Sequence, residues 1–478
     1  MLTAHERATL EAQRRVAVLP AEIDAWVTAS TTNAAGLGIH RSQIAALRDM
    51  LDELVGRQRD LLAQRPAPEA SAAYAEAELA LGEEIVGSYE LWSVFRSSLD
   101  QRRDPAMARL LDAADLVAAD AYRACLERAR SWGIVTDDEF REPPLVCLEP
   151  VHTPETAARG KAAAGLSATI QRYRSQRLPI PIVRFPSDRV RSPWFLTTLA
   201  HEVGHDVDAD LALAGEVADR IETALAGAGV SETRRASWAD WSGEMVADGI
   251  GIALAGAAFA GVLADWLLVL APAARFGEPS GGPHPPHYLR VRLLAAMLRA
   301  AGVAAWTDTA ANLEAAAEAG TTPAWEKPFG DDVATVAQAV VGTDLAALAD
   351  HSLLELATDP AADSERATTL AAYLRTGFNR PPPGGPPAFP FRLVPVAAEQ
   401  AVRAAGPAAD LEAIGKRTID FLHAIPRPQF LAAGAAATRR AFLRGLAARI
   451  DVRQHGEAEP ALGGPPDVPM PAQPVPHQ

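Results

Sequence analysis

The stretch His201-Glu202-Val203-Gly204-His205 is the most informative part of this sequence. If it forms an α-helix, the two histidines lie one turn apart on the same face, with a carboxylate beside them. Paired imidazoles with this spacing are typical of a zinc site in a protein. Because a five-residue pattern of this kind also arises by chance, other residues of the chain have to support the interpretation.

A catalytic zinc typically has three protein ligands, so a third must come from elsewhere in the chain. The metzincin class would need glycine and histidine where this chain has Asp208 and Leu211, which excludes that class. Glu244 lies 39 residues after His205, in a second helical pattern, and can be the third ligand. Asp248, one turn further on, can accept the second N–H of a ligand imidazole and fix its tautomer.

Three blocks of the chain, in this order, resemble the gluzincin metallopeptidases, in particular the group that contains the HtpX heat-shock protease and the CAAX prenyl endopeptidases. The blocks HEVGH (201–205), EMVADGIG (244–251) and HPPHYLR (284–290) are similar to the family patterns H-E-x-G-H, E-x-x-A-D-x-x-G and H-P-x-x-x-x-R. The resemblance covers about residues 178–296. Well-known members have several membrane-spanning helices, whereas this chain has at most one candidate, so a membrane location and membrane substrates are not implied.

The resemblance implies a metallopeptidase that hydrolyses a peptide or protein substrate with one Zn²⁺ ion. The expected ligands are His201, His205 and Glu244. Glu202 is expected to be the general base and acid, which takes a proton from the zinc-bound water and passes it to the leaving amine. Zinc binding alone does not require a glutamate at this position, so Glu202 favours an enzyme.

The tetrahedral oxyanion of such a reaction needs a hydrogen-bond donor besides the metal. Three residues of the third block are candidates, and His284 has the position that matches the family. A helix-capping role for His284 is an equally good interpretation. We expect Arg290 to pair with a carboxylate in the core rather than to contact substrate. The candidate donors are His284, His287 and Tyr288.

The segment 178–186, with the sequence LPIPIVRFP, is the best predicted strand of the chain. Pro179 and Pro181 place their missing N–H donors on the same side, which predicts an edge strand. A peptide substrate can pair with the free edge of such a strand. We therefore expect Ile180 and Ile182 to contact the substrate.

Residues 1–135 have the periodicity of helices. Apolar residues recur at steps of three and four in two segments, and a third helix is predicted from Asp104-Pro105, with an acidic cap and proline in the first turn, to Gly133. Ser192-Pro193 has the same signature and should begin the helix of the HEVGH block.

These patterns predict a mainly α-helical protein with a zincin-like core that contains a small β-sheet. The predicted parts are an N-terminal helical region (1–135), the core (136–303), a C-terminal helical region (304–456) and a disordered proline-rich tail (457–478).

The composition excludes some partners. The formal net charge of −15 makes nucleic acid an unfavourable partner.

The segment 249–274 is apolar except for Asp265, and we expect it to be a buried helix rather than a membrane span. No secretory signal is visible, which favours a cytoplasmic location. Cys125 lies on an apolar helical stripe, so we expect it to be buried. The oligomeric state is not predicted.

Two other functions are compatible with the sequence. The protein can be a zinc-binding helical scaffold without catalysis, or an interaction protein in which helical flanks and the proline-rich tail recruit a partner. An ordinary helix with two satisfied histidines is a third interpretation of the HEVGH stretch. Zinc content and peptide cleavage distinguish the enzyme, the scaffold and the ordinary helix. Removal of residues 457–478, with loss of a partner as the readout, tests the interaction protein.

Overall fold

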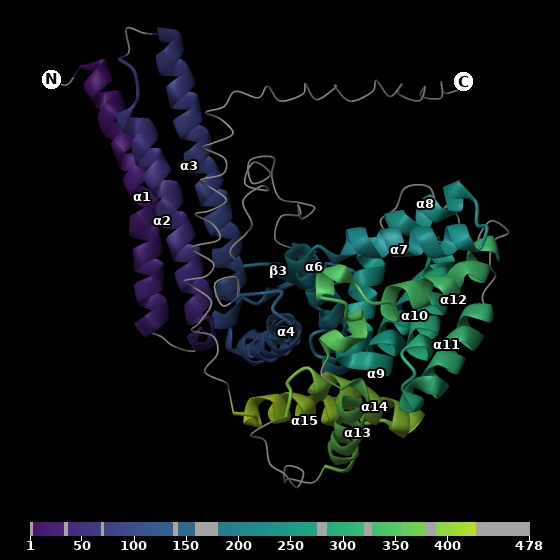
Figure 1. The fold of residues 1–478 in the computed structure, drawn as a ribbon. Helices are drawn as coiled ribbons and strands as arrows, with labels where there is room; N and C mark the ends of the chain where they lie inside the picture. The colour runs from purple at the N-terminus through teal and green to yellow at the C-terminus, as the bar shows by residue number, and fades with distance from the viewer. Residues whose placement is uncertain are drawn as a thin grey trace, which may run out of the picture.

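The computed structural model describes residues 3–32, 37–67, 71–136, 142–157, 180–274, 284–319, 327–357, 359–377 and 389–426. They form a mainly helical molecule with one small sheet, which confirms this part of the predicted fold class (Figure 1). The predicted tail (457–478) lies outside the described residues. The α-helices are α1 (Ala4–Thr32), α2 (Arg41–Ala63), α3 (Ser71–Asp100), α4 (Pro105–Ser131), α6 (Leu199–Leu211), α7 (Leu213–Gly227), α8 (Glu232–Asp240), α9 (Ser242–Ala274), α10 (His287–Ala300), α11 (Thr307–Glu318), α12 (Lys327–Val341), α13 (Pro360–Thr376), α14 (Leu393–Ala405) and α15 (Leu411–Ala424).

The N-terminal helices α1, α2 and α3 lie side by side along one flank of the molecule (Figure 1). Leucines of α2 and α3 that recur at helical spacing, including Leu54 and Leu81, are fully buried between them. The rings of Trp26 and Trp92 pack edge to face with their centroids 5.4 Å apart. The helical periodicity of α1, α2 and α3 therefore marks the core of a small bundle.

Helix α4 begins and ends as its sequence predicts. The Asp104 side chain accepts a hydrogen bond from the N–H of Ala106, Pro105 is the first helical residue, and Gly133 follows the helix with a φ of 77°. Unlike α1 to α3, this helix packs in the larger core, with Cys125 fully buried as expected. Burial raises the pKa of the Cys125 thiol to about 12, so this thiol is unreactive at neutral pH.

The sheet contains β1 (Leu145–Glu149), β2 (Glu155–Ala157) and β3 (Ile182–Pro186) in the order β1-β3-β2. Strand β3 is parallel to β1 and antiparallel to β2, so it is the central strand and the prediction of an edge strand is wrong. Pro181 precedes the strand and its carbonyl accepts the N–H of Leu145 at 2.9 Å. Pro186 is the last residue of β3, so neither of these prolines removes a donor from the middle of the ladder.

The sheet separates two apolar cores. Leu145 and Ile182 face the core of the N-terminal bundle, whereas the next residues, Val146 and Val183, face the larger core. This alternation follows from the two-residue side-chain period of a strand. The larger core extends from Leu111 in α4 to residue 425, so helices on both sides of the boundary predicted at residue 303 share it.

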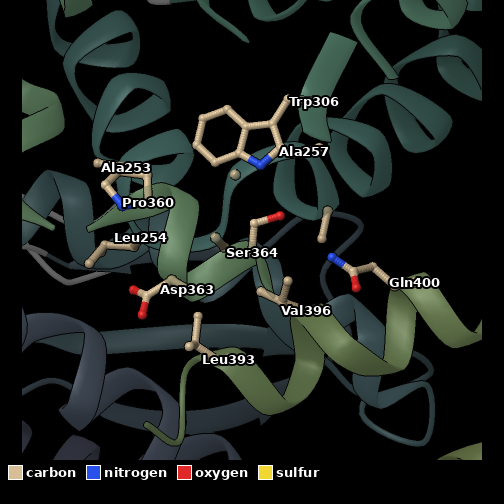
Figure 2. Close-up of a pocket in the computed structure, with 13 residues that line it drawn as sticks. Ala253, Leu254, Ala257, Trp306, Pro360, Asp363, Ser364, Leu393, Val396 and Gln400 are labelled. Atoms are coloured by element: carbon tan, nitrogen blue, oxygen red, sulfur yellow. The ribbon is translucent and has the colours of Figure 1, made fainter. Parts of the chain in front are cut away.

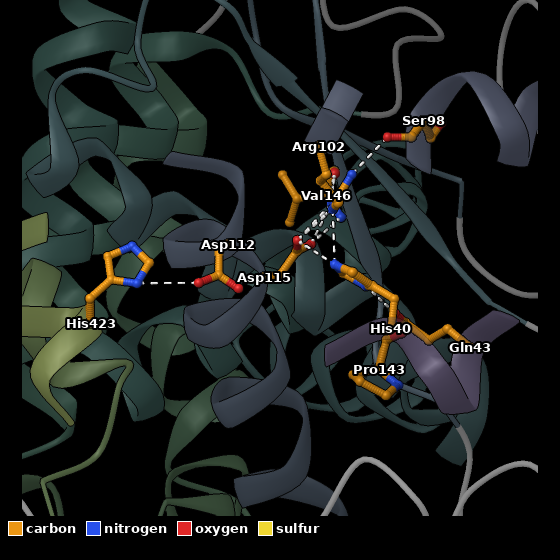
Figure 3. A network of polar contacts seen from close by, with 9 residues as sticks. All are labelled: His40, Gln43, Ser98, Arg102, Asp112, Asp115, Pro143, Val146 and His423. Carbon is orange, nitrogen blue, oxygen red and sulfur yellow. Dashed lines mark hydrogen bonds and ion pairs between the residues drawn. The ribbon is translucent and has the colours of Figure 1, made fainter. Parts of the chain in front are cut away.

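A buried polar network joins the two cores (Figure 3). Arg102 donates two hydrogen bonds from Nη2 to the Asp115 carboxylate, at 2.8 and 2.6 Å, and Asp115 accepts the N–H of Val146 in β1 at 3.0 Å. His40 Nε2 lies 3.3 Å from Asp115 and 2.9 Å from Arg102 Nε. These groups fix the sheet relative to the helices on each side.

Helix α9 is apolar and bent. Gly256 has φ 57° and ψ −140°, which interrupts the helix, and the Trp306 ring packs against this glycine. A cavity of about 20 Å³ lies at the bend, lined partly by Ser364 and Gln400 (Figure 2). A cavity of this volume holds about one water molecule, so it is too small for a substrate.

One helix of the described residues, over Ser242–Val269, is long and apolar enough to cross a membrane. Of its most apolar window, 72% is buried inside the molecule, as is typical of a core helix. The segment 249–274, which was predicted to be a buried helix, belongs to this mostly buried helix. The cytoplasmic location was expected because no secretory signal is visible, and it stays a prediction.

Candidate metal centre

The HEVGH block lies on α6, which is preceded by a short 3-10 helix over Pro193–Thr198. The α-helix therefore begins six residues later than Pro193, and the side chain of Ser192 makes no capping hydrogen bond. Within α6, His201 and His205 lie on one face with their ring centroids 4.7 Å apart.

Helix α6 crosses α9 at a point where both backbones come close together. A Cβ atom on Gly204 would lie 2.8 Å from the Cα atom of Ala247 and 2.9 Å from its carbonyl oxygen. Real Cβ atoms essentially never make contacts this short. Glycine in the first block and alanine in the second thus allow the approach that brings Glu244 to the histidines. The glycine and the alanine are visible in the sequence, but only the packing of α6 against α9 shows why small residues are needed at these two positions.

The structure brings together the three residues that were predicted to bind a metal. The potential ligand atoms of His201, His205 and Glu244 all lie within 4.8 Å of one another. Glu244 Oε2 is 3.4 Å from His201 Nε2, and Glu244 Oε1 is 3.4 Å from His205 Nε2. Ligands bound at 2.0 to 2.1 Å in a tetrahedron lie about 3.3 to 3.4 Å apart, so both pairs suit zinc.

The chemistry of the donors supports the same interpretation. Glu244 Oε2 is buried and accepts no hydrogen bond from the described residues, although it lies among positive and imidazole groups. Two imidazoles and a carboxylate are the ligand types of a catalytic zinc site. A cation bound at this point would give the buried oxygen a partner, so the residues fit a zinc ion.

Asp248 orients one of the two imidazoles. Its Oδ1 atom lies 2.9 Å from His201 Nδ1, so Nδ1 carries the hydrogen and Nε2 faces Glu244. Arg290 donates hydrogen bonds from Nε and Nη2 to the two Asp248 oxygens, each at 2.8 Å. Both Asp248 and Arg290 are buried, which confirms that Arg290 pairs with a carboxylate in the core.

The ionisable groups of this centre shift one another's pKa values. Burial would lower the pKa of His201, but the neighbouring carboxylates of Asp248 and Glu244 outweigh it and raise the pKa to about 10. Burial would raise the pKa of Glu244 and of Asp248; for Glu244 the two histidines and Arg290 outweigh it, and for Asp248 Arg290 and His201 do so. Both carboxylates are therefore ionised at neutral pH. Asp248 and Glu244 raise the pKa of Arg290 against the effect of burial.

Glu202 is buried beside this group, with 4% of its surface exposed. Burial raises the pKa of its carboxyl, while His201 and His205 act in the opposite direction. The Thr156 hydroxyl of β2 donates a hydrogen bond to the Glu202 carbonyl at 3.3 Å, which places β2 next to this turn of α6. A carboxyl with a raised pKa is suited to accept and return a proton.

The three candidate oxyanion donors lie at the start of α10 but in different surroundings. The side chain of His284 is 54% exposed and its Nε2 atom is 3.3 Å from Glu244 Oε1. His287 turns toward α9, with its ring 6.5 Å from that of Trp266, and Tyr288 is buried. Burial lowers the pKa of both histidines, which favours their neutral forms. Of the three, His284 is the one placed against the ligand group.

The residues predicted to contact a peptide are not on an edge. Ile182 lies in the central strand and Ile180 just before it, and both are buried in the core of the N-terminal bundle. Residues 182–184 of β3 pair with β1 on one side and with β2 on the other, so this part of the strand has no free edge for a substrate. Among the described strands, β2 is the outer strand on the side of α6.

Sequence reasoning missed two contacts of the centre. The guanidinium of Arg290 reaches Glu244 as well as Asp248, with Nη2 3.2 Å from Glu244 Oε2. The Phe259 ring stacks near His201, with centroids 6.2 Å apart and planes at 14°. The position of Arg290 in the third block marked it as a core residue, but no sequence signal indicated Phe259, which lies beyond the bend of α9 at Gly256.

Comparisons with known proteins do not assign this chain to a family. No family model matches it, and neither a curated protein nor a solved structure shows significant similarity to it.

Proposed function

We propose that this protein is a zinc-dependent metallopeptidase with a zincin-like core. The observation that supports this most directly is the meeting of His201, His205 and Glu244, with the carboxyl of Glu202 on the same turn of α6. The resemblance of three sequence blocks to gluzincin peptidases supports the same proposal, because these blocks contribute the residues that meet.

Each residue of the group has a defined task in this proposal. A zinc ion held by His201, His205 and Glu244 would supply a Lewis acid and a water of lowered pKa. The Glu202 carboxylate accepts a proton from the attacking water and transfers it to the leaving amine nitrogen. Asp248 holds one hydrogen of His201 on Nδ1, so Nε2 is the atom whose proton a zinc ion would displace.

Two further parts of the site concern the substrate. His284, half exposed beside Glu244, is the best placed donor for the oxyanion of the reacting carbonyl. An extended peptide would pair with β2 rather than β3, since β2 is the outer strand next to Glu202. This placement replaces the roles first predicted for Ile180 and Ile182.

The proposal is tested by metal content and peptide hydrolysis of the purified full-length protein. We expect about one zinc per chain and cleavage of an unstructured protein such as casein. Glu202→Gln should keep the zinc and lose nearly all turnover, because the amide cannot accept the proton. Glu232→Gln, at an exposed position of α8, is the matched control and should leave both unchanged.

The other outcomes have definite meanings. Absence of zinc from the purified protein and from protein incubated with zinc would overturn the proposal. Zinc binding without cleavage of any peptide would favour the alternative, a zinc-binding scaffold or interaction protein. Loss of zinc in Glu202→Gln would show that Glu202 is a ligand and that the assigned roles are wrong.

A further inference from the structure

Arg290 has an unusual position for a fully charged side chain. It lies in the first turn of α10 and is 4% exposed. Its hydrogen bonds to Asp248 use Nε and Nη2, which form a two-pronged contact with both carboxylate oxygens. The same Nη2 atom is 3.2 Å from Glu244 Oε2 and 3.4 Å from each ring nitrogen of His201. One guanidinium thus touches residues of α6 and α9 from a third helix.

The contacts of Asp248 show why this position matters. Asp248 is fully buried, and its Oδ1 atom faces both Arg290 Nη2 at 2.8 Å and His201 Nδ1 at 2.9 Å. Arg290 therefore sets the plane of the carboxylate that sets the orientation of His201. A planar guanidinium can hold a carboxylate in one orientation, whereas an ammonium group acts as a point charge and does not.

The contact with Glu244 is of a different kind. Arg290 lies at ion-pair distance from Glu244 Oε2, yet this oxygen accepts no hydrogen bond from the described residues. The guanidinium thus balances the charge of Glu244 without occupying its oxygen. The two buried carboxylates, one turn apart on α9, both contact this guanidinium. This arrangement can assemble the ligands before a metal arrives.

We infer that Arg290 is a positioning residue that preassembles the metal centre, by holding Asp248 and through it His201 in the ligand orientation, and by balancing Glu244 while its oxygen stays available. This inference rests on the proposed zinc site. It assigns to Arg290 a role in metal affinity and ligand geometry, and no contact with the substrate.

The test compares three full-length variants with the unchanged protein. Arg290→Met removes the charge and both hydrogen bonds, and Arg290→Lys keeps the charge but not the two-pronged contact. Arg299→Met is the matched control, since Arg299 lies on the same helix, is about half exposed and pairs with Glu314. Zinc affinity is measured by competition with a chromophoric chelator, and ligand geometry by the visible spectrum of the Co²⁺-substituted protein.

We expect Arg290→Met to bind zinc about 10-fold to 100-fold more weakly, the usual effect of removing a partner of a metal ligand. Arg290→Lys should recover only part of this loss, and both should change the Co²⁺ spectrum. Arg299→Met should match the unchanged protein. If Arg290→Met does not fold, the double variant Asp248→Leu/Arg290→Met removes both buried charges. This double variant should fold but show the same loss of affinity and the same spectral change.

Three results would count against the inference in different ways. If the unchanged protein binds no zinc, the proposed function fails, and the inference with it. If the unchanged protein binds zinc and Arg290→Met, or the double variant in its place, has the same affinity and Co²⁺ spectrum, the inference alone is wrong. Full recovery by Arg290→Lys would also overturn it, because a point charge would then be sufficient.

Discussion

At the scale of single residues, Gly204 controls the distance between the two helices that carry the metal ligands. Replacing Gly204 with alanine would place a methyl group 2.8 Å from the Ala247 backbone, which cannot move aside as a flexible side chain could. We expect Gly204→Ala to reduce the free energy of unfolding by about 1 to 3 kcal/mol through overpacking. Zinc affinity should fall as well, because Glu244 moves away from the histidines. Urea denaturation and chelator competition measure the two effects.

Gly215 provides the matched control for this prediction. It lies on α7, is exposed, and a Cβ atom there would meet nothing within 4 Å. Gly215→Ala should therefore leave the stability unchanged or increase it by about 0.5 to 1 kcal/mol, because alanine favours the helix. If Gly204→Ala behaves in the same way as this control, the close approach of α6 and α9 is not the reason for the glycine.

At the scale of elements, the bend of α9 at Gly256 lies between Glu244 and Phe259, the residue whose ring stacks near His201. Gly256 combines a φ of 57° with a Trp306 ring 2.5 Å from the position of an added Cβ atom. We expect Gly256→Ala to destabilise the protein by more than the roughly 1 to 3 kcal/mol that such a sparsely populated backbone conformation costs by itself, because the added methyl group would also clash with the Trp306 ring. Thermal or urea denaturation measures this difference.

Gly229 separates the cost of a positive φ from the cost of the Trp306 contact. It has a φ of 74°, but a Cβ atom there would meet nothing within 4 Å. Gly229→Ala should show the cost of a positive φ without a clash, so it should destabilise the protein less than Gly256→Ala. Equal losses in the two variants would mean that the Trp306 contact adds nothing to the requirement for glycine at the bend.

The elements themselves were predictable to different degrees. The boundaries of α4 followed from Asp104, Pro105 and Gly133, because capping and backbone conformation act over a few neighbouring residues. The place of β3 in the sheet did not follow from its sequence. Pro181 and Pro186 are compatible with a central strand because they lie at its ends, and this depends on where the ladder with β1 begins.

At the scale of the whole molecule, Asp115 connects the N-terminal bundle to the larger core. Burial would raise its pKa, but Arg102, His40 and the Val146 N–H outweigh burial and lower it. The stabilisation from this carboxylate is therefore fully present above its unfolded pKa, near 4, and is lost as the pH falls through the lower pKa of the folded state. We expect the free energy of unfolding to fall with acidification below about pH 4.

The variant Asp115→Asn tests this expectation. It should destabilise the protein at neutral pH by about 3 to 5 kcal/mol, because Arg102 stays buried without its counter-charge. It should also flatten the acid dependence, which urea denaturation across pH 2.5 to 7 measures. Asp188→Asn, at a side chain 71% exposed, is the control and should retain the stability and acid dependence of the unchanged protein. An acid dependence of Asp115→Asn as steep as that of the unchanged protein would show that other carboxylates cause it.

Local sequence was sufficient for the helical character, for the caps of α4 and for the placement of His201 and His205 on one helical face. These features depend on backbone propensity and on spacing within one or two turns of helix, which the order of residues specifies directly. Packing between distant segments set the remaining features, namely the central place of β3, the contact of Arg290 with both Glu244 and Asp248, and the arrival of Phe259 beside His201. Strand order and helix crossing follow from contacts between residues far apart in the chain, and pattern alone does not specify which of those contacts form.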